Sequence, residues 1–170
     1  MRLLLPSLFA LAGLTACQET AAPPVTPTGP TVVAASDIEQ GRYLIAIGSC
    51  NDCHTPGFAQ SGGATPEGER LIGNPVGYAG PWGVTYASNL RLSVAGMSED
   101  AFVAMLATRT ASPPMPWPAV SAMSESDKRA VYRYIRSLGA AGTAAPAALP
   151  PGVKATTPVE VMTPVMPDAV

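Results

Sequence analysis

Three stretches of the chain carry apolar residues at the spacing of an amphipathic helix. They are residues 37–48, 99–109 and 125–138. A serine stands immediately before each stretch: Ser36, Ser98 and Ser124. A serine hydroxyl in that position can accept a hydrogen bond from an unpaired backbone N–H of the first helical turn. Gly139 follows the third stretch as a natural stop. The pattern predicts three main helices and an all-α fold.

The segments between these helices are rich in turn residues. Glycine and proline recur along residues 55–97 and break any long element there. A loop of this length is usually functional or disordered, and a large apolar cofactor could supply the core that it lacks. Residues 112–118 contain four prolines, so we expect no helix over that segment.

The two ends of the chain differ from its middle. Residues 1–16 carry one arginine and an apolar run of about a dozen residues, which is too short to span a bilayer and fits an export signal better than a buried helix. The composition of residues 17–35 predicts a Pro-rich linker, part of which could instead pack on the domain as an arm. Residues 36–139 form the expected domain. Residues 140–170 are either a tail or a strand that wraps around it.

Composition limits the size and the partners of this domain. The 170 residues leave room for one domain of modest size. Charged residues make up 13% of the chain, and the formal net charge is −2. Nucleic-acid binding needs clustered lysine and arginine, so this composition argues against it.

The segment Cys50-Asn51-Asp52-Cys53-His54 has the C-x-x-C-H spacing of a covalent haem c attachment site. Its two thiols are spaced to meet the two vinyl groups of one porphyrin, and the imidazole of His54 would then lie beneath the iron. Three alternatives are a structural disulfide, a redox-active dithiol and half of a zinc site. No βαβ pattern surrounds the pair, and the sequence has no second Cys/His cluster to complete a zinc site.

The iron's second ligand cannot be another imidazole, because His54 is the only histidine. Methionine, lysine, tyrosine, water or no ligand remain, and a His/Met pair suits electron transfer. Met115 is our candidate because Pro113, Pro114 and Pro116 stiffen the backbone around it. The alternative is a core residue in a proline-rich turn. For the other methionines within helical segments, core packing is the expected role.

The end of the apolar N-terminal run, Leu14-Thr15-Ala16-Cys17, resembles a bacterial lipoprotein signal. The resemblance implies that Cys17 is the lipidated first residue of the mature protein and that Gln18 favours the outer-membrane side of the periplasm. The alternative is ordinary secretion and a soluble periplasmic protein. The three cysteines fit this assignment, since lipid takes one and haem takes two.

Together these residues resemble class I c-type cytochromes over residues 36–138. More narrowly, they resemble the cytochrome c domains of membrane-associated dehydrogenase cytochrome subunits of proteobacteria. The segments that carry the resemblance are residues 50–54, 80–90, 98–102, 114–117 and 132–138. Two departures are the single haem site and the shortened segment 91–96. We therefore carry over the fold and electron transfer, but not the identity of the subunit.

The resemblance implies a small cytochrome c fold of about three main helices with long haem-covering loops. One haem c would be held at Cys50 and Cys53, with its iron between His54 and Met115. The first and last helices would cross at small residues, which Gly41 matches. Five further residues are candidates to hydrogen-bond the haem propionates: Trp82, Tyr86, Asn89, Arg91 and Trp117.

The function that follows is a one-electron carrier in a periplasmic respiratory or dehydrogenase-linked chain, and not an enzyme in itself. Expected partners are a dehydrogenase donor, an oxidase or cytochrome acceptor, and the membrane through a lipid at Cys17. The basic side chains of the third helix could steer an acidic partner or form an ordinary solvated face. If Met115 does not reach the iron, a five-coordinate sensor or peroxidase-like enzyme is the alternative. A thiol oxidoreductase without haem is the third hypothesis.

Overall fold

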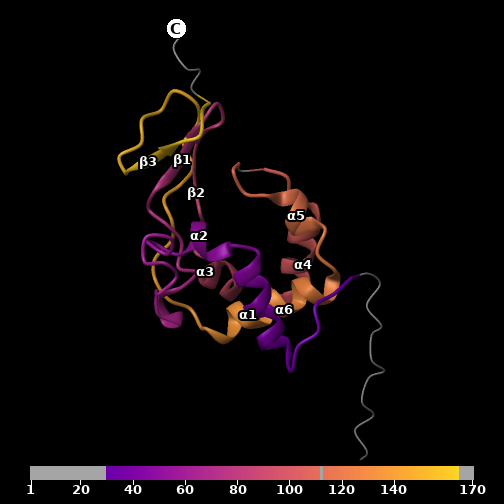
Figure 1. The fold of residues 1–170 in the computed structure, drawn as a ribbon. Coiled ribbons are helices and arrows are strands. Elements are labelled where there is room, and N and C mark those ends of the chain that lie inside the picture. The colour runs from indigo at the N-terminus through magenta and orange to yellow at the C-terminus, as the bar shows by residue number, and fades with distance from the viewer. Residues whose placement is uncertain (1–29, 112, 165–170) are drawn as a thin grey trace, which may run out of the picture.

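The computed structural model describes residues 30–111 and 113–164 and shows a mostly helical chain with a small three-stranded sheet (Figure 1). The export signal, Cys17 and Gln18 lie outside the described residues. The helices are α1 (Asp37–Ile47), α2 (Cys50–His54), α3 (Leu90–Ala95), α4 (Glu99–Thr108), α5 (Trp117–Ser121) and α6 (Glu125–Ser137), with a 3-10 turn at Glu67–Glu69. The strands are β1 (Gly77–Gly80), β2 (Gly83–Tyr86) and β3 (Val159–Val161).

The three predicted helices are confirmed as α1, α4 and α6, each within one residue of its predicted bounds. The serine caps are confirmed as well. The hydroxyls of Ser36, Ser98 and Ser124 accept hydrogen bonds from backbone N–H groups three residues later, at 3.2, 3.2 and 3.1 Å. These contacts satisfy orphan donors of the first turn, which is why the helices begin where they do.

The prediction of an all-α fold is wrong in one respect, because the turn-rich segment contains a hairpin. β1 and β2 pair antiparallel, and β3 from the C-terminal segment pairs parallel with β1. Glycines make this packing close: a Cβ at Gly80 would lie 2.6 Å from the Trp82 ring, and one at Gly83 would lie 2.1 Å from the Leu149 oxygen. Strands of four residues that begin with glycine carry no alternation of apolar and polar side chains from which they could be predicted.

The C-terminal segment is a wrapping arm over its described part, residues 140–164. Val84 and Leu149 exchange both backbone hydrogen bonds, at 2.9 and 2.8 Å. Beyond this bridge the arm reaches β1 and adds β3 to the sheet. Figure 1 shows the sheet at one end of the molecule and the crossing of α1 and α6 at the other.

Two further helices depart from the predicted loops. α5 begins at Trp117 and includes Pro118, although the segment 112–118 was expected to be non-helical. A proline in the first turn costs little, because its missing N–H would have had no helical partner there. α3 lies within the turn-rich segment, and the Asn89 side chain caps it by accepting from the Leu92 N–H at 3.0 Å.

The core is organised by the crossing of α1 and α6. A Cβ built on Gly41 would lie 2.1 Å from the Ala130 backbone oxygen and 2.6 Å from the Tyr134 Cβ. The absence of a side chain at Gly41 thus lets the two backbones approach, which confirms the expected small residue at this crossing. Leu44, Ile45 and Ile135 are buried in the cluster that forms around it.

Two residues of the linker pack on the domain, as the arm alternative predicted. The buried Asp127 carboxylate accepts hydrogen bonds from the Thr31 hydroxyl at 2.7 Å, the Val32 N–H at 3.1 Å and the Gln40 amide at 2.7 Å. Burial of Asp127 disfavours its charge, but these hydrogen bonds outweigh burial and hold its pKa below the usual value. Within the described residues, no helix has the length and apolarity needed to cross a bilayer.

Gly41→Ala should destabilise the protein by about 1–3 kcal/mol, because the added methyl overlaps backbone atoms of α6. Urea denaturation measures the loss. Gly68→Ala is the matched control, since a Cβ there would have no neighbour within 4 Å. Equal stability of the two variants would contradict a close crossing.

Asp127→Asn should lower the free energy of unfolding at pH 7 by about 1–3 kcal/mol. The depressed pKa of Asp127 means that its contribution is present at neutral pH and is lost as pH falls through the folded-state pKa. The gap between variant and parent should therefore narrow as pH falls from about pH 5 to about pH 2. The exposed Glu69, as Glu69→Gln, is the control. A difference in unfolding free energy that stays constant over this pH range would contradict the stabilising role of the Asp127 carboxylate.

Candidate functional site

The C-x-x-C-H segment forms the single helical turn α2, directly after α1. Gly48 ends α1, and Ser49 has a left-handed backbone with a φ of 52°, so the chain changes direction before Cys50. Cys50 and Cys53 are three residues apart in one helical turn and therefore share a face. Both are free thiols, and both are half-buried. The thiols are thus presented together, as attachment at two points requires.

The acidity of Cys50 bears on the dithiol alternative. Burial, with smaller contributions from Cys53 and Asp52, raises the pKa of the Cys50 thiol to about 11. Redox-active cysteines have the opposite property, because a lowered pKa keeps the attacking sulfur as thiolate. The environment of Cys50 is therefore not that of a nucleophilic thiol.

His54 is buried, with 6% of its surface exposed, and its ring is held in one orientation. The Nδ1 atom lies 2.7 Å from the Ser88 carbonyl oxygen. A carbonyl can only accept, so Nδ1 carries the hydrogen and Nε2 has the free lone pair. Burial lowers the pKa of His54, against a smaller opposite effect of the Ser88 hydrogen bond. Among the described residues, no hydrogen-bond partner lies at Nε2. A neutral imidazole with one nitrogen bound to a carbonyl and the other free is the form that ligates metals.

The C-terminal end of α2 is fastened to the loop that follows. The buried Thr55 hydroxyl donates to the Asn51 side-chain oxygen at 2.8 Å and accepts from the Leu71 N–H at 2.8 Å. The Gly73 N–H donates to the His54 carbonyl at 2.9 Å. These contacts hold the position of His54 from the side opposite α1.

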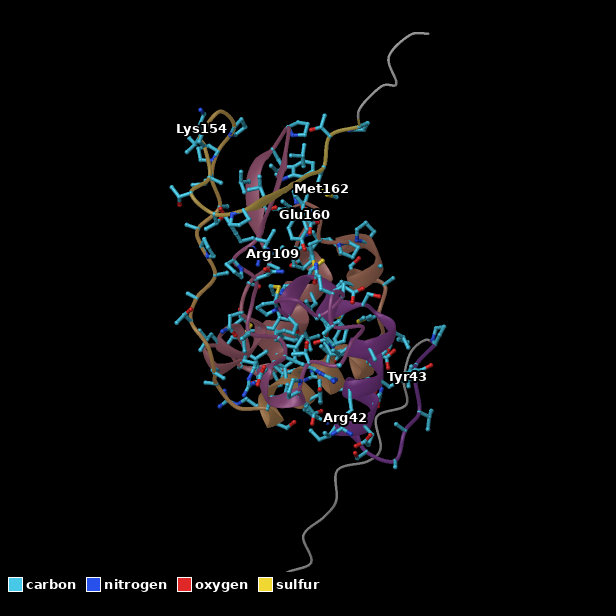
Figure 2. The ribbon with its side chains drawn as sticks, turned by 60° about the vertical axis from the view of Figure 1, so that its left-hand side comes forward. Arg42, Tyr43, Arg109, Lys154, Glu160 and Met162 are labelled. Carbon is cyan, nitrogen blue, oxygen red and sulfur yellow. The ribbon has the colours of Figure 1, made fainter. Side chains whose placement is uncertain are left out.

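A pocket of about 440 Å³ opens beside Cys53. Its walls come from α2, the following loop, β1 and β3, and its lining includes Asp52, Asn74, Tyr78 and Glu160. Figure 2 shows Glu160 and Met162 of the arm at the end of the molecule away from Arg42 and Tyr43 of α1. The arm thus adds a carboxylate, that of Glu160, to the surroundings of Cys53.

Met115 lies in the segment between α4 and α5 and is half-buried. It lines a second pocket, of about 430 Å³, together with Arg109, Pro113 and Trp117. The Arg109 guanidinium lies over the Trp117 ring, 5.2 Å from its centroid. The structure therefore brings Cys50, Cys53 and His54 together on one turn, whereas Cys53 and Met115 line separate pockets.

The candidate propionate ligands with aromatic rings all have protein partners. The Trp82 indole donates to the Tyr78 carbonyl at 3.2 Å, and the Tyr86 hydroxyl lies 2.9 Å from the Thr157 hydroxyl. The Trp117 indole donates to the Ala111 carbonyl. Their role toward propionates stays a prediction.

Asn89 and Arg91 are both buried; Asn89 contacts the start of the C-terminal arm, and Arg91 contacts the residues just before it. The Asn89 amide donates to the carbonyls of residues 141 and 143, at 2.8 and 3.1 Å. The Arg91 guanidinium donates to the carbonyls of residues 68, 138 and 139. These side chains therefore join the loop, the end of α6 and the arm, a structural role that their residue types alone do not indicate.

Two groups at the site could not be identified from sequence patterns. Ser88 acts through its backbone carbonyl, and a backbone group gives no signal in residue type. Thr85 contacts the Met115 segment by donating from its hydroxyl to the Pro113 carbonyl. Only the fold brings it there. Within residues 30–111 and 113–164, no cluster of three or more His, Cys, Asp or Glu side chains is arranged to hold a metal ion.

The chain is similar to one part of a bacterial dehydrogenase. It is 31% identical over 123 residues to a nicotinate dehydrogenase subunit of Pseudomonas putida. The match covers 67% of this chain but 10% of that protein, so the chain corresponds to a small part of the relative. No protein-family model matches the chain, and no solved structure matches it significantly.

Proposed function

We propose that this protein is a one-electron carrier with a single haem c, attached at Cys50 and Cys53 and ligated by His54 and Met115. The observation that carries the proposal is the arrangement of the cysteine and histidine side chains on α2. Two reduced thiols share one turn with a buried imidazole whose Nδ1 is bound to the Ser88 carbonyl. This donor set fits a covalently held haem and its proximal ligand.

Each residue of the turn has a separate task in this proposal. Cys50 and Cys53 hold the group by thioether bonds, so that it stays on an exported protein. His54 offers Nε2 to the iron, and the hydrogen bond from Nδ1 to Ser88 fixes the ring and raises the basicity of Nε2. A bound haem c supplies a one-electron couple between Fe(III) and Fe(II).

Met115 completes the proposed ligand pair. Prolines on both sides of it limit the backbone, so little conformational freedom is lost on ligation. A thioether raises the reduction potential relative to a second imidazole. The Trp117 indole and the Arg109 guanidinium line the same pocket as Met115.

The proposed partners are redox proteins of the cell envelope. The likeness to a dehydrogenase subunit supports a dehydrogenase as electron donor, and an oxidase or another cytochrome would be the acceptor. A lipid at Cys17 would hold the chain at the periplasmic side of a membrane.

Most of the basic side chains of α6 are already paired within the protein. Arg133 pairs with Glu99 at 2.8 Å and with Asp37, and Arg129 pairs with Glu99 at 3.1 Å. The buried Lys128 ammonium donates to a backbone carbonyl at 2.8 Å. Arg136 is exposed and has no carboxylate partner among the described residues, so it is the charge of α6 that is left to steer an acidic partner.

A five-coordinate haem protein, acting as a sensor or peroxidase-like enzyme, is the second candidate. The observation that favours it is that Cys53 and Met115 line separate pockets. The thiol oxidoreductase hypothesis has less support, because the pKa of Cys50 is raised instead of lowered.

The absorption spectrum of the full chain, exported in a host that attaches haem c, separates these candidates. His/Met ligation gives a sharp reduced α-band and a weak oxidised band at ~695 nm. High-spin bands that shift with CO would instead favour the five-coordinate protein. Absence of a Soret band would contradict both haem proposals.

Cys50→Ala combined with Cys53→Ala should lose the haem that survives a denaturing gel, whereas Ser49→Ala should keep it.

Met115→Ala should lose the ~695 nm band and lower the midpoint potential, because the iron loses its thioether ligand. Met123→Ala is the matched control, since Met123 is also half-buried and follows α5. Spectroscopy and redox titration are the measurements. A Met115→Ala protein that keeps both properties would assign the second ligand to another residue.

A further inference from the structure

The segment 85–88 contacts one proposed iron ligand, His54, and the backbone that carries the other, Met115. At one end, the Ser88 carbonyl holds the His54 ring at 2.7 Å. At the other end, the Thr85 hydroxyl donates to the carbonyl of Pro113, two residues before Met115. Thr85 lies in β2, and Ser88 follows it by three positions, just beyond the end of the strand.

The Thr85 contact joins the Met115 segment, residues 113–116, to β2. The other hydrogen bonds of residues 113–116 go to α5: the Met115 carbonyl accepts from the Trp117 N–H at 2.9 Å, and the Pro116 carbonyl accepts from residues 119 and 120. Among the described residues, Thr85 is the one hydrogen-bond partner of residues 113–116 outside α5. Residues 113, 114 and 116 are prolines and donate no backbone N–H, so a carbonyl is the natural point at which to fix this segment.

The strand that carries Thr85 is itself held on both sides. β2 pairs with β1 along its whole length, and its neighbour Val84 exchanges two backbone hydrogen bonds with Leu149. The Tyr86 hydroxyl is bound to Thr157 of the arm at 2.9 Å. A residue on so constrained a strand can fix a segment whose other hydrogen bonds, among the described residues, go to α5.

We propose that Thr85 is a positioning residue for Met115. Its hydroxyl holds the Pro113 carbonyl, so that the segment that orients His54 through Ser88 also sets the place of the second ligand. The inference rests on the proposed function, because it takes Met115 as the ligand. Thr85 itself acts through Pro113.

Competition by an added ligand tests the inference. Imidazole binds ferric iron only when the methionine leaves, so a loosened Met115 segment should raise its affinity. Thr85→Val removes the hydroxyl and should bind imidazole between about threefold and tenfold more tightly, the equivalent of one lost hydrogen bond. Its ~695 nm band should also weaken. Thr85→Ser keeps the hydroxyl and should stay within about twofold of the parent. Parent-like affinity in Thr85→Val would overturn the inference.

Two further variants test whether Thr85 acts through Met115. Thr157→Val loses a hydroxyl bound to the same strand but not to the Met115 segment, and its imidazole affinity should match that of the parent. In the Met115→Ala background, Thr85→Val should have no further effect on imidazole affinity, because the ligand that it positions is gone. A full effect in that background would mean that Thr85 acts in another way. If Thr85→Val fails to fold, Thr85→Ala and the same background comparison decide.

The two proposals fail in different ways. If the parent has no ~695 nm band, or if Met115→Ala leaves that band unchanged, the assignment of Met115 fails and the inference fails with it. If Met115→Ala abolishes the band but imidazole affinity is unchanged in Thr85→Val, only the role of Thr85 is wrong.

Discussion

The hydrogen bond between the His54 imidazole and the Ser88 carbonyl is the contact on which the organisation of the site depends. It joins α2 to a segment that lies 34 residues later in the chain. The same segment leads into Asn89, which caps α3 and binds the backbone of the arm. One contact thus couples the orientation of a ring nitrogen to the placement of a loop, a helix and the C-terminal arm.

The local part of this fold could be predicted from the sequence. Serine caps and apolar periodicity define α1, α4 and α6, and Gly41 identifies the close crossing of α1 and α6. These features depend on neighbours in sequence or on the size of one residue. The strands could not be predicted, because β1 and β3 are about eighty residues apart and their pairing depends on backbone groups that every residue has.

The candidate site shows the same difference between local features, which could be predicted, and distant contacts, which could not. The spacing of Cys50, Cys53 and His54 is local and was found directly. For Asn89 and Arg91 the residue types indicated hydrogen bonding, but the partners in the structure are protein carbonyls. Thr85 gave no signal, since a threonine in a strand is ordinary. Distant partners decide what such side chains do, and their identity follows only from the fold.

The arm has a consequence for association between copies of the chain. A two-stranded hairpin is marginally stable alone, and its open edges are templates for pairing with another strand. Here a single segment pairs with both strands of the hairpin: Leu149 with Val84 of β2, and β3 with β1. The outer edge of the sheet beside β1 is therefore β3, an exposed strand of three residues with Glu160 at its centre. A strand this short, with a charge at its centre, is a poor template for pairing with a second copy of the chain.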